Sequence, residues 1–405
     1  MIYDRKSNVI DTEMLFCDAI TANDKYIWFI AVSQNILFKI ERWTGNVIPC
    51  GRIPNSKRTA IAYRSLFEFE EKLFLFPYEE LNICIYDIQA DEFNYVELDK
   101  RYSNEFESWK FIGSIRVGDE LILYGVNPII VILNIINKKI EYIDLRERLP
   151  QSINAKFWFW NAPFVLKNEL HFVMLIMPYI IKIKIDDRIV TYKKIPEDEK
   201  KICIDNPIFY NDCLWYINRD NKDKVMLSKY NMNLEEVECY AMNIKKESSY
   251  RAFSYVGNIN GKLWMIPGTC NQGIVYNLME NTEKKIDNLP MVDIEKLDMV
   301  FPHEFNYRTA CLTEDGHIIT IHAWSRQMVD IDTKDGTILT HLLNKVDSEL
   351  WAKLFNDIFK KECAKHYYEQ VSGMLESYIN NNTEVIKSEK THSKKYIGGE
   401  IYDLL

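Results

Sequence analysis

The sequence lacks the short motifs that identify the commonest catalytic and nucleotide-binding sites. It contains no Gly-x-Ser-x-Gly turn, no Gly-x-x-x-x-Gly-Lys-Ser/Thr loop and no His-Glu-x-x-His pair. These absences disfavour α/β-hydrolase, P-loop and zincin chemistry, because each depends on its motif for a nucleophile, a phosphate cradle or a metal. The Ser-x-Asp-x-Gly-x-Thr-Trp box of sialidases has no convincing copy either. We therefore assign no catalytic residue from motifs.

Disulfide and metal chemistry also lack their usual residue patterns. The nine cysteines include no Cys-x-x-Cys pair, and their number is odd. Most lie in apolar stretches such as Ile83-Cys84-Ile85, which is typical of buried free thiols in a reducing compartment. The seven histidines are scattered, whereas a zinc site needs several ligands close together. The sequence predicts neither a metal nor another cofactor.

A positive charge excess and a membrane-spanning run are both missing. The net charge is -9 at pH 7, which disfavours binding to nucleic acid and to an anionic membrane. The richest apolar stretches, 128–136 and 172–185, are interrupted or too short to span a bilayer. The first residues lack the apolar core of a secretion signal. We expect a cytoplasmic protein with no nucleic-acid or membrane partner.

The sequence does contain one short motif that occurs seven times. Each copy is a tight turn followed by a short apolar strand, as in Asn260-Gly261-Lys262-Leu263-Trp264. With the fourth residue as anchor, the copies fall at residues 26, 73, 121, 170, 214, 263 and 318, at spacings of 47, 48, 49, 44, 49 and 55. A period of about 40–50 residues is typical of propeller blades.

A second landmark follows every anchor. An apolar or aromatic residue precedes Asp, Asn or Glu, which lies 13 to 17 residues after the anchor, as at Tyr86-Asp87. Asp and Asn end strands because their side chains bond to nearby backbone groups. Each unit then has four short strands, which predicts an all-β, seven-bladed β-propeller of four-stranded antiparallel blades. An irregular pair of β-sandwiches with accidental spacing is the alternative.

The chain divides into three parts. Residues 1–344 are expected to form the propeller, with blades at about 13–53, 59–98, 111–145, 157–195, 202–242, 252–289 and 309–343. Residues 345–382 carry apolar residues at three- and four-residue steps, which predicts a C-terminal amphipathic helix or helix pair. It would pack on the propeller or contact a partner protein. Residues 383–405 are polar and lysine-rich and predict a disordered tail.

The chain resembles the kelch-type β-propellers over about residues 12–343. Gly-Lys-Leu-Trp at 261–264 and Val-Tyr-Asn at 275–277 match the second and third strands of that family. Tyr86-Asp87 and Tyr230-Asn231 match its Tyr-Asp position. The Gly-Gly doublet of the family is absent, with Pro267-Gly268 as the nearest substitute, and its fourth-strand Trp is missing. The resemblance implies the fold, and any function taken from it is an analogy.

One pattern predicts a binding site. In a propeller, the connection from one blade's outer strand to the next blade's inner strand lies on one face, near the axial channel. Several of these connections carry a basic residue beside small or aromatic ones. The candidate ligand-binding residues are Arg58, Trp109, Lys110, Lys156, Trp158, Trp160, Tyr250, Arg251, Tyr307 and Arg308. Converging cations would attract an anion, and aromatic rings would stack on a sugar or a base.

Three functions fit this pattern. The first is a non-catalytic binding or scaffold propeller for an anionic small molecule, a glycan or a partner peptide. The second is a lyase or hydrolase acting on an acidic sugar, with the arginines on its carboxylate and Tyr307 or His303 as acid or base. Only Glu105 and Glu304 are candidate carboxylates, which weakens glycosidase chemistry. The third is a protein-interaction hub working through residues 345–405. Solvated cations at loop ends and aromatics in the core would produce the same pattern without any ligand.

Overall fold

The fold was obtained as a computed structural model of the chain. It describes residues 17–31, 35–54, 61–106, 108–151, 153, 161–197, 204–218, 225–244, 251–292, 306–322 and 324–343. The helix predicted at 345–382 and the tail predicted at 383–405 lie outside these residues. In the part that is described, no helix is long and apolar enough to cross a bilayer.

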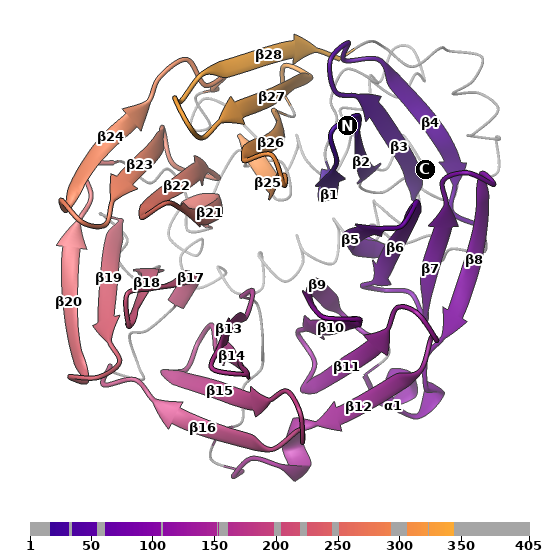
Figure 1. Cartoon of the computed structure of the whole chain (residues 1–405), viewed down its shortest axis with the longest axis horizontal. Coiled ribbons are helices and arrows are strands. Elements are labelled where there is room, and N and C mark those ends of the chain that lie inside the picture. The colour runs from indigo at the N-terminus through magenta and orange to yellow at the C-terminus, as the bar shows by residue number, and fades with distance from the viewer. Residues whose placement is uncertain are drawn as a thin grey trace, which may run out of the picture.

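Seven four-stranded sheets stand around a central opening (Figure 1). Each sheet is antiparallel and keeps its strands in chain order, from an innermost strand beside the opening to an outermost strand at the perimeter. The prediction of an all-β, seven-bladed propeller is therefore confirmed. The seventh sheet begins at Tyr307, two residues before the expected boundary at 309.

The strands of blades one to four are β1 (Cys17–Ala22), β2 (Tyr26–Ala31), β3 (Ile36–Glu41), β4 (Val47–Arg52), β5 (Tyr63–Phe69), β6 (Lys72–Pro77), β7 (Asn82–Asp87), β8 (Glu92–Glu97), β9 (Phe111–Val117), β10 (Glu120–Gly125), β11 (Ile129–Asn134), β12 (Ile140–Asp144), β13 (Phe164–Leu166), β14 (Glu169–Val173), β15 (Tyr179–Lys184) and β16 (Val190–Lys194). The strands of blades five to seven are β17 (Ile204–Tyr210), β18 (Cys213–Asn218), β19 (Met226–Asn231), β20 (Glu236–Ala241), β21 (Phe253–Ile259), β22 (Lys262–Pro267), β23 (Gly273–Asn277), β24 (Thr282–Ile286), β25 (Tyr307–Leu312), β26 (His317–His322), β27 (Gln327–Asp332) and β28 (Ile338–Leu342).

Within the described residues, two short helices lie outside the blades. The helix α1 (Lys100–Phe106) follows blade two, and the 3-10 helix η1 (Leu145–Glu147) follows blade three. Arg146 of η1 forms ion pairs with Glu105 of α1 and with Asp144. The sequence pattern did not predict either helix, because both are too short to show a 3.6-residue period.

The repeated turn motif forms the hairpin between the first and second strands of each blade. In blade four, Lys167 and Asn168 both have positive φ, as do Asn260 and Gly261 in blade six. Two consecutive residues of this kind are typical of a type I′ turn, whose twist matches that of the paired strands. The anchors that follow are buried in six blades, at Leu73, Leu121, Leu170, Leu214, Leu263 and Ile318.

The second landmark ends the third strand, as the sequence predicted. The Oδ1 atom of Asp87 accepts hydrogen bonds from the backbone N–H groups of Gln89, at 3.1 Å, and Ala90, at 3.0 Å. Asn134 makes the same contacts in blade three, with Ile136 and Asn137. The acceptor side chain satisfies backbone donors that the strand leaves unpaired, so the turn forms at this point in the chain.

The hydrophobic core lies between neighbouring blades. Phe76 of blade two packs in one cluster with Leu121 of blade three, and Ile122 of blade three packs in the next cluster with Phe172 of blade four. Successive residues of a strand point to opposite faces of its sheet, so each blade supplies side chains to two clusters. The core therefore forms a ring around the channel and leaves the axis open.

Candidate functional site

The two ends of the central channel are defined by the innermost strands. These strands, β1, β5, β9, β13, β17, β21 and β25, surround the opening (Figure 1). Four antiparallel strands return the chain to the side from which it started, so every innermost strand begins on the same side of the ring. We call that end of the channel the start mouth and the opposite end the turn mouth.

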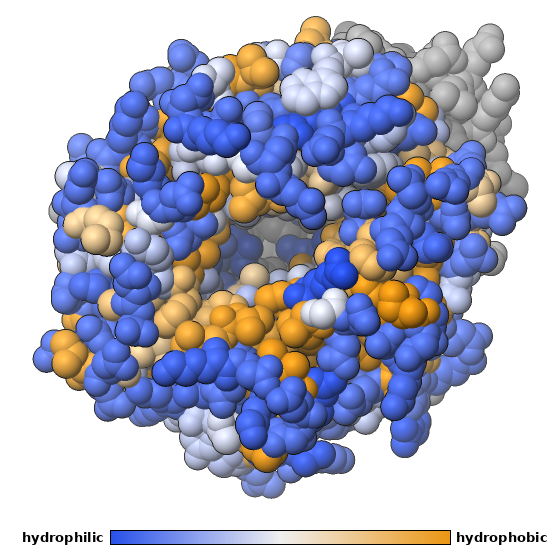
Figure 2. Space-filling view, viewed as in Figure 1, coloured by the Kyte–Doolittle hydropathy of each residue, from blue (hydrophilic) through white to orange (hydrophobic). Residues whose placement is uncertain are grey.

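The wall of the opening is partly apolar. Figure 2 shows hydrophobic side chains gathered on the wall over blades three and four, whereas hydrophilic side chains cover most of the surrounding face. The innermost strand of blade four contributes Val165, which is 45 % exposed. The ring of its neighbour Phe164 stacks on Phe209 of blade five with the centroids 5.1 Å apart. Such a wall suits a ligand that has an apolar face, for example a sugar ring.

Two arginines occupy equivalent irregularities at the start mouth. The register of β5 against β6 shifts at Arg64, and the register of β25 against β26 shifts where Arg308 lies. Each arginine follows a buried tyrosine, Tyr63 or Tyr307, and is itself half-buried. A β-bulge re-aims its extra residue away from the regular pleat. The same Tyr-Arg pair therefore stands in blades two and seven, on either side of blade one.

Arg251 joins blade six to blade five at the same mouth. Its Nε atom lies 3.1 Å from Oδ1 of Asp205, whose side chain is 1 % exposed, whereas that of Arg251 is 25 % exposed. Burial raises the pKa of Tyr124, and the positive charge of Arg251 opposes that rise. Tyr124 belongs to blade three, across the opening from blade six (Figure 1). The guanidinium of Arg251 therefore reaches toward the axis of the channel.

Lys110 and Arg64 lie against one aromatic ring. The Nζ atom of Lys110 is 4.7 Å from the centroid of Tyr78, and the Cζ atom of Arg64 is 5.1 Å from it. Lys110 Nζ also lies 3.3 Å from Oε1 of Glu79. Each cation–π contact of this kind contributes about 0.5–1 kcal/mol at an exposed site. Tyr78 and Glu79 thus hold two basic side chains on the side of the ring where the innermost strands begin.

Two of the predicted aromatic residues lie in the core and not at the mouth. Trp109 is 2 % exposed, and its Nε1–H donates to the carbonyl oxygen of Leu81 at 2.9 Å. Tyr307 is fully buried, and its hydroxyl donates to the carbonyl oxygen of Pro290 at 2.7 Å. Each ring finds its single polar partner inside the protein and packs its apolar body between blades. Contrary to the expectation from the sequence, neither ring is available to stack on a ligand.

The other eight candidate residues fall into two groups. Lys110, Arg251 and Arg308 lie at the start mouth, as described above. Five others fall outside the described residues, namely Arg58, Lys156, Trp158, Trp160 and Tyr250.

Sequence reasoning missed Arg64, Asp205 and Tyr78. A signal for Arg64 was present, because it lies nine residues before the anchor Leu73, close to the ten residues that separate Arg308 from its own anchor. Arg58, which was chosen instead, lies 15 residues before Leu73. Asp205 gave no signal, because its partner belongs to the next blade.

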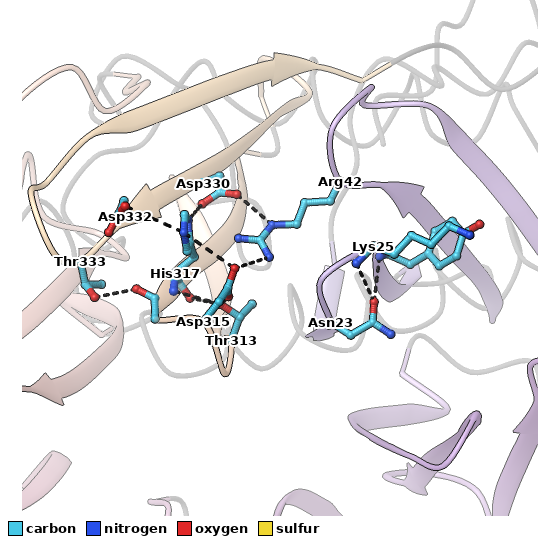
Figure 3. A network of polar contacts seen from close by, with 11 residues as sticks. Asn23, Lys25, Arg42, Thr313, Asp315, His317, Asp330, Asp332 and Thr333 are labelled. Carbon is cyan, nitrogen blue, oxygen red and sulfur yellow. Dashed lines mark hydrogen bonds and ion pairs between the residues drawn. The ribbon is translucent and has the colours of Figure 1, made fainter.

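A second polar network joins blade seven to blade one (Figure 3). Arg42 is fully buried, and its Nε and Nη1 atoms donate to Asp330 Oδ2 at 3.0 Å and to Asp315 Oδ2 at 3.1 Å. His317 Nδ1 lies 2.6 Å from Asp330 Oδ1, with Asp332 Oδ2 at 4.0 Å from Nε2. Carboxylates and an imidazole are metal donors, yet across the described ranges no three such side chains are placed to hold a metal ion. The guanidinium lies between two of the carboxylates, so we interpret the network as the closure of the ring.

Comparison with known proteins supports the fold but identifies no family. No protein-family model matches the sequence, and neither does any curated protein sequence. Among solved structures, virginiamycin B lyase from Staphylococcus aureus matches with a TM-score of 0.55 at 13 % identity, over 78 % of this chain and 94 % of that one.

Two longer proteins contain a similar unit. The extracellular domain of BT4673 from B. thetaiotaomicron gives a TM-score of 0.52 at 14 % identity, over 78 % of this chain and 38 % of that one. PorZ, an essential bacterial surface component of the type-IX secretion system of Porphyromonas gingivalis, gives 0.52 at 10 % identity, over 82 % and 38 %. At these identities the likeness shows the propeller fold alone, and the neighbours range from an enzyme to a secretion-system component.

Proposed function

We propose that this protein binds an anionic ligand at the start mouth of its channel. The observation that supports this most is the Tyr-Arg pair at the bulges of blades two and seven, which sets Arg64 and Arg308 on either side of blade one. Arg251 and Lys110 lie on the same side of the ring. The ligand is a small molecule, a glycan or a partner peptide that carries a carboxylate, phosphate or sulfate.

The physical basis is the concentration of positive charge at a narrow opening. A guanidinium binds carboxylate or phosphate through two parallel N–H···O bonds. Two of the four basic side chains are held by carboxylates, Arg251 by Asp205 and Lys110 by Glu79. These two carboxylates also hold their partners in place, so less conformational entropy is lost when a ligand binds. Local potential decides anion binding, which is why a net charge of -9 does not exclude it.

The test is a binding titration with citrate, sulfate and glucuronate, followed by thermal shift and calorimetry. We expect at least one of these anions to raise the melting temperature of the wild type. A hydrogen bond to a charged group contributes about 1.5–3 kcal/mol, so the loss of one such bond weakens binding about 10- to 100-fold, and the double variant Arg64→Ala/Arg308→Ala should lose at least that much.

Arg116 provides the matched control. Its Cζ atom lies 4.3 Å from the ring centroid of Phe69, and its Nε–H donates to the carbonyl oxygen of Gly118, near the turn mouth. Arg116→Ala removes one positive charge from the opposite end of the channel, where the double variant removes two from the start mouth, and should leave the affinity unchanged. Equal affinities in the wild type and the Arg64/Arg308 variant would contradict the proposal.

The enzymatic alternative loses two of its candidates. Tyr307 is buried and its pKa is raised by that burial, so it does not serve as an acid or base at the channel. Glu105 lies in α1 on the outer flank, where it pairs with Arg146. His303 and Glu304 lie outside the described residues. Virginiamycin B lyase shows that a similar propeller can be an enzyme. Enzymatic activity is therefore the second candidate function, after ligand binding.

Three further points belong to the same proposal. The kelch-type relationship rests on the Tyr-Asp positions and the Gly-Lys-Leu-Trp strand. A cytoplasmic location rests on the cysteine usage. A role as an interaction hub rests on residues 345–405. If this role is correct, a truncated chain that ends at residue 344 should fail to bind partner proteins that the full chain binds.

A further inference from the structure

The turn between β26 and β27 of blade seven brings together a hydroxyl, an imidazole and an amide. Ser325 lies in this turn, and its Oγ atom is 2.6 Å from Nδ1 of His322, the last residue of β26. His322 Nε2 lies 3.4 Å from Oδ1 of Asn306, the residue before β25. A nucleophile within hydrogen-bond reach of a base, which a third group orients, is the arrangement of an activated serine.

Neighbouring contacts decide which nitrogen of His322 carries the proton. The backbone N–H of Ser325 points to Nδ1 at 3.3 Å, so Nδ1 has a lone pair. Oδ1 of Asn306 already accepts from the backbone N–H of Val292 at 2.7 Å, so the proton between the two side chains belongs to Nε2. The hydroxyl of Ser325 donates to Oε1 of Gln327, at 2.7 Å, and also lies within hydrogen-bond distance of Nδ1, so its one proton has two acceptors.

Burial separates the base from the hydroxyl. His322 is 1 % exposed and its ring centroid lies 5.2 Å from that of Tyr307. This burial lowers the pKa of His322 to about 4, so the imidazole is neutral near pH 7. Ser325 is half-buried and lies at the surface of the turn. A reagent can thus meet Oγ while the base stays out of water.

We propose that Ser325 is a nucleophile toward carboxylic esters, with His322 as its general base and Asn306 as the residue that positions His322. Oγ forms a bond to the acyl carbon while its proton passes to Nδ1. The ester C–O bond then breaks, and the departing alkoxide takes that proton from Nδ1. Water repeats the two steps on the acyl-serine, releases the acid and restores the hydroxyl. Relative to the chymotrypsin arrangement, the two ring nitrogens exchange roles, and an amide oxygen replaces the carboxylate. This activity goes beyond anion binding at the start mouth and does not depend on it.

The test is covalent labelling of the full-length chain. An alkyl fluorophosphonate reacts with an activated serine: the Oγ–P bond forms, the P–F bond breaks and fluoride leaves with the serine proton as HF. We expect one adduct per chain, located at Ser325 by peptide mass spectrometry, and hydrolysis of p-nitrophenyl acetate above the buffer rate. Ser325→Ala should abolish both. His322→Gln should slow labelling at least tenfold, because a general base contributes about 10²–10⁴ to the rate.

Ser254 provides the matched control. Its Oγ atom donates to the carbonyl oxygen of Ile266 at 3.4 Å and is half-buried like Ser325. Ser254→Ala should label as fast as the wild type. Labelling of the wild type no faster than that of Ser325→Ala overturns the proposal, and so does an equal rate in a folded His322→Gln variant. The Ser325→Ala comparison decides the matter even where the buried His322 variant fails to fold.

Discussion

At the scale of single residues, burial keeps two histidines uncharged in the folded protein. His171 and His322 are both 1 % exposed. Burial lowers the pKa of His171, with the charge of Lys182 adding to the effect, although Glu169 lies 3.4 Å from Nε2. Burial alone lowers the pKa of His322 to about 4. Both imidazoles are therefore neutral in the folded protein at pH 7, and they must gain a proton only when the chain unfolds in acid.

This difference predicts acid sensitivity. A folded pKa below the unfolded value of about 6.5 means that the unfolded chain binds more protons, so stability falls as pH drops from 6.5 toward 4. Between pH 7 and pH 4.5, His322 should account for a loss of about 2–3 kcal/mol of unfolding free energy. Urea unfolding at the two pH values measures it. His322→Gln should show a smaller loss by that amount.

His341 supplies the control for this measurement. It lies on the outermost strand β28, away from the core clusters. His341→Gln makes the same change of side chain outside the core and therefore controls for the substitution itself. An unchanged acid sensitivity in His322→Gln would mean that other groups, such as His171, govern the acid transition.

At the scale of elements, two glycines fix the backbone beside the basic residues of the start mouth. A Cβ atom on Gly125, at the end of β10, would lie 2.1 Å from the carbonyl oxygen of Lys110. A Cβ atom on Gly268, just after β22, would lie 2.6 Å from the carbonyl oxygen of Arg251. Thr269 also donates to that oxygen, from its backbone N–H and from its hydroxyl, both at 3.0 Å. The close approach of two backbones is thus what places each cation.

Gly268→Ala should therefore disturb Arg251 in particular. Overpacking of this kind costs about 1–3 kcal/mol of stability, and we also expect the affinity for the anion to fall, because the guanidinium moves with its backbone. Denaturant unfolding and the anion titration check the two effects. Gly273→Ala is the control, since its neighbours are the methyl ends of Leu289 and Ile286, which can shift. If Gly268→Ala binds the anion as tightly as the wild type, Arg251 does not contribute to binding.

The elements also show what the sequence could predict. The turn between the first two strands recurs in every blade, and buried anchors such as Leu73 and Leu263 recur in six of the seven, because each must form the same local structure. Local patterns of this kind can be read from residue types alone. The connections between blades vary in length, so the direction of a basic side chain in them depends on contacts with the next blade. That is why Arg251 was found without its partner Asp205, and why Arg64 was missed.

At the scale of the whole molecule, the ring closes through side chains. Blades one and seven each take their four strands from one continuous segment, so in the described part of the chain no strand is shared between them. One hydrophobic cluster spans the junction and includes Phe29 of blade one and Ile321 of blade seven. The ion pairs of Arg42 with Asp330 and Asp315 lie beside it (Figure 3). Among the described residues, these contacts are what hold blades one and seven together.

Arg42→Met should open this junction. The change leaves Asp330, whose side chain is 2 % exposed, without the cation that offsets its desolvation, at a cost of about 3–5 kcal/mol. Because the junction lies between the first and last blades, amide hydrogen exchange should accelerate together in β1 and in β25–β27. The double variant Arg42→Met/Asp330→Leu removes both charges and should recover part of the lost stability.

Arg188 gives the comparison within the ring. Its Nη2 atom lies 2.6 Å from Oε1 of Glu120 in blade three, but its side chain is 18 % exposed. Arg188→Met should cost less, about 1 kcal/mol, because water screens the pair. It should also leave amide hydrogen exchange in β1 unchanged, because blades three and four are consecutive in the chain and stay joined by the backbone. Equal losses in the two variants would indicate that the closing junction is no weaker than an internal one, and that the ring opens at some other place.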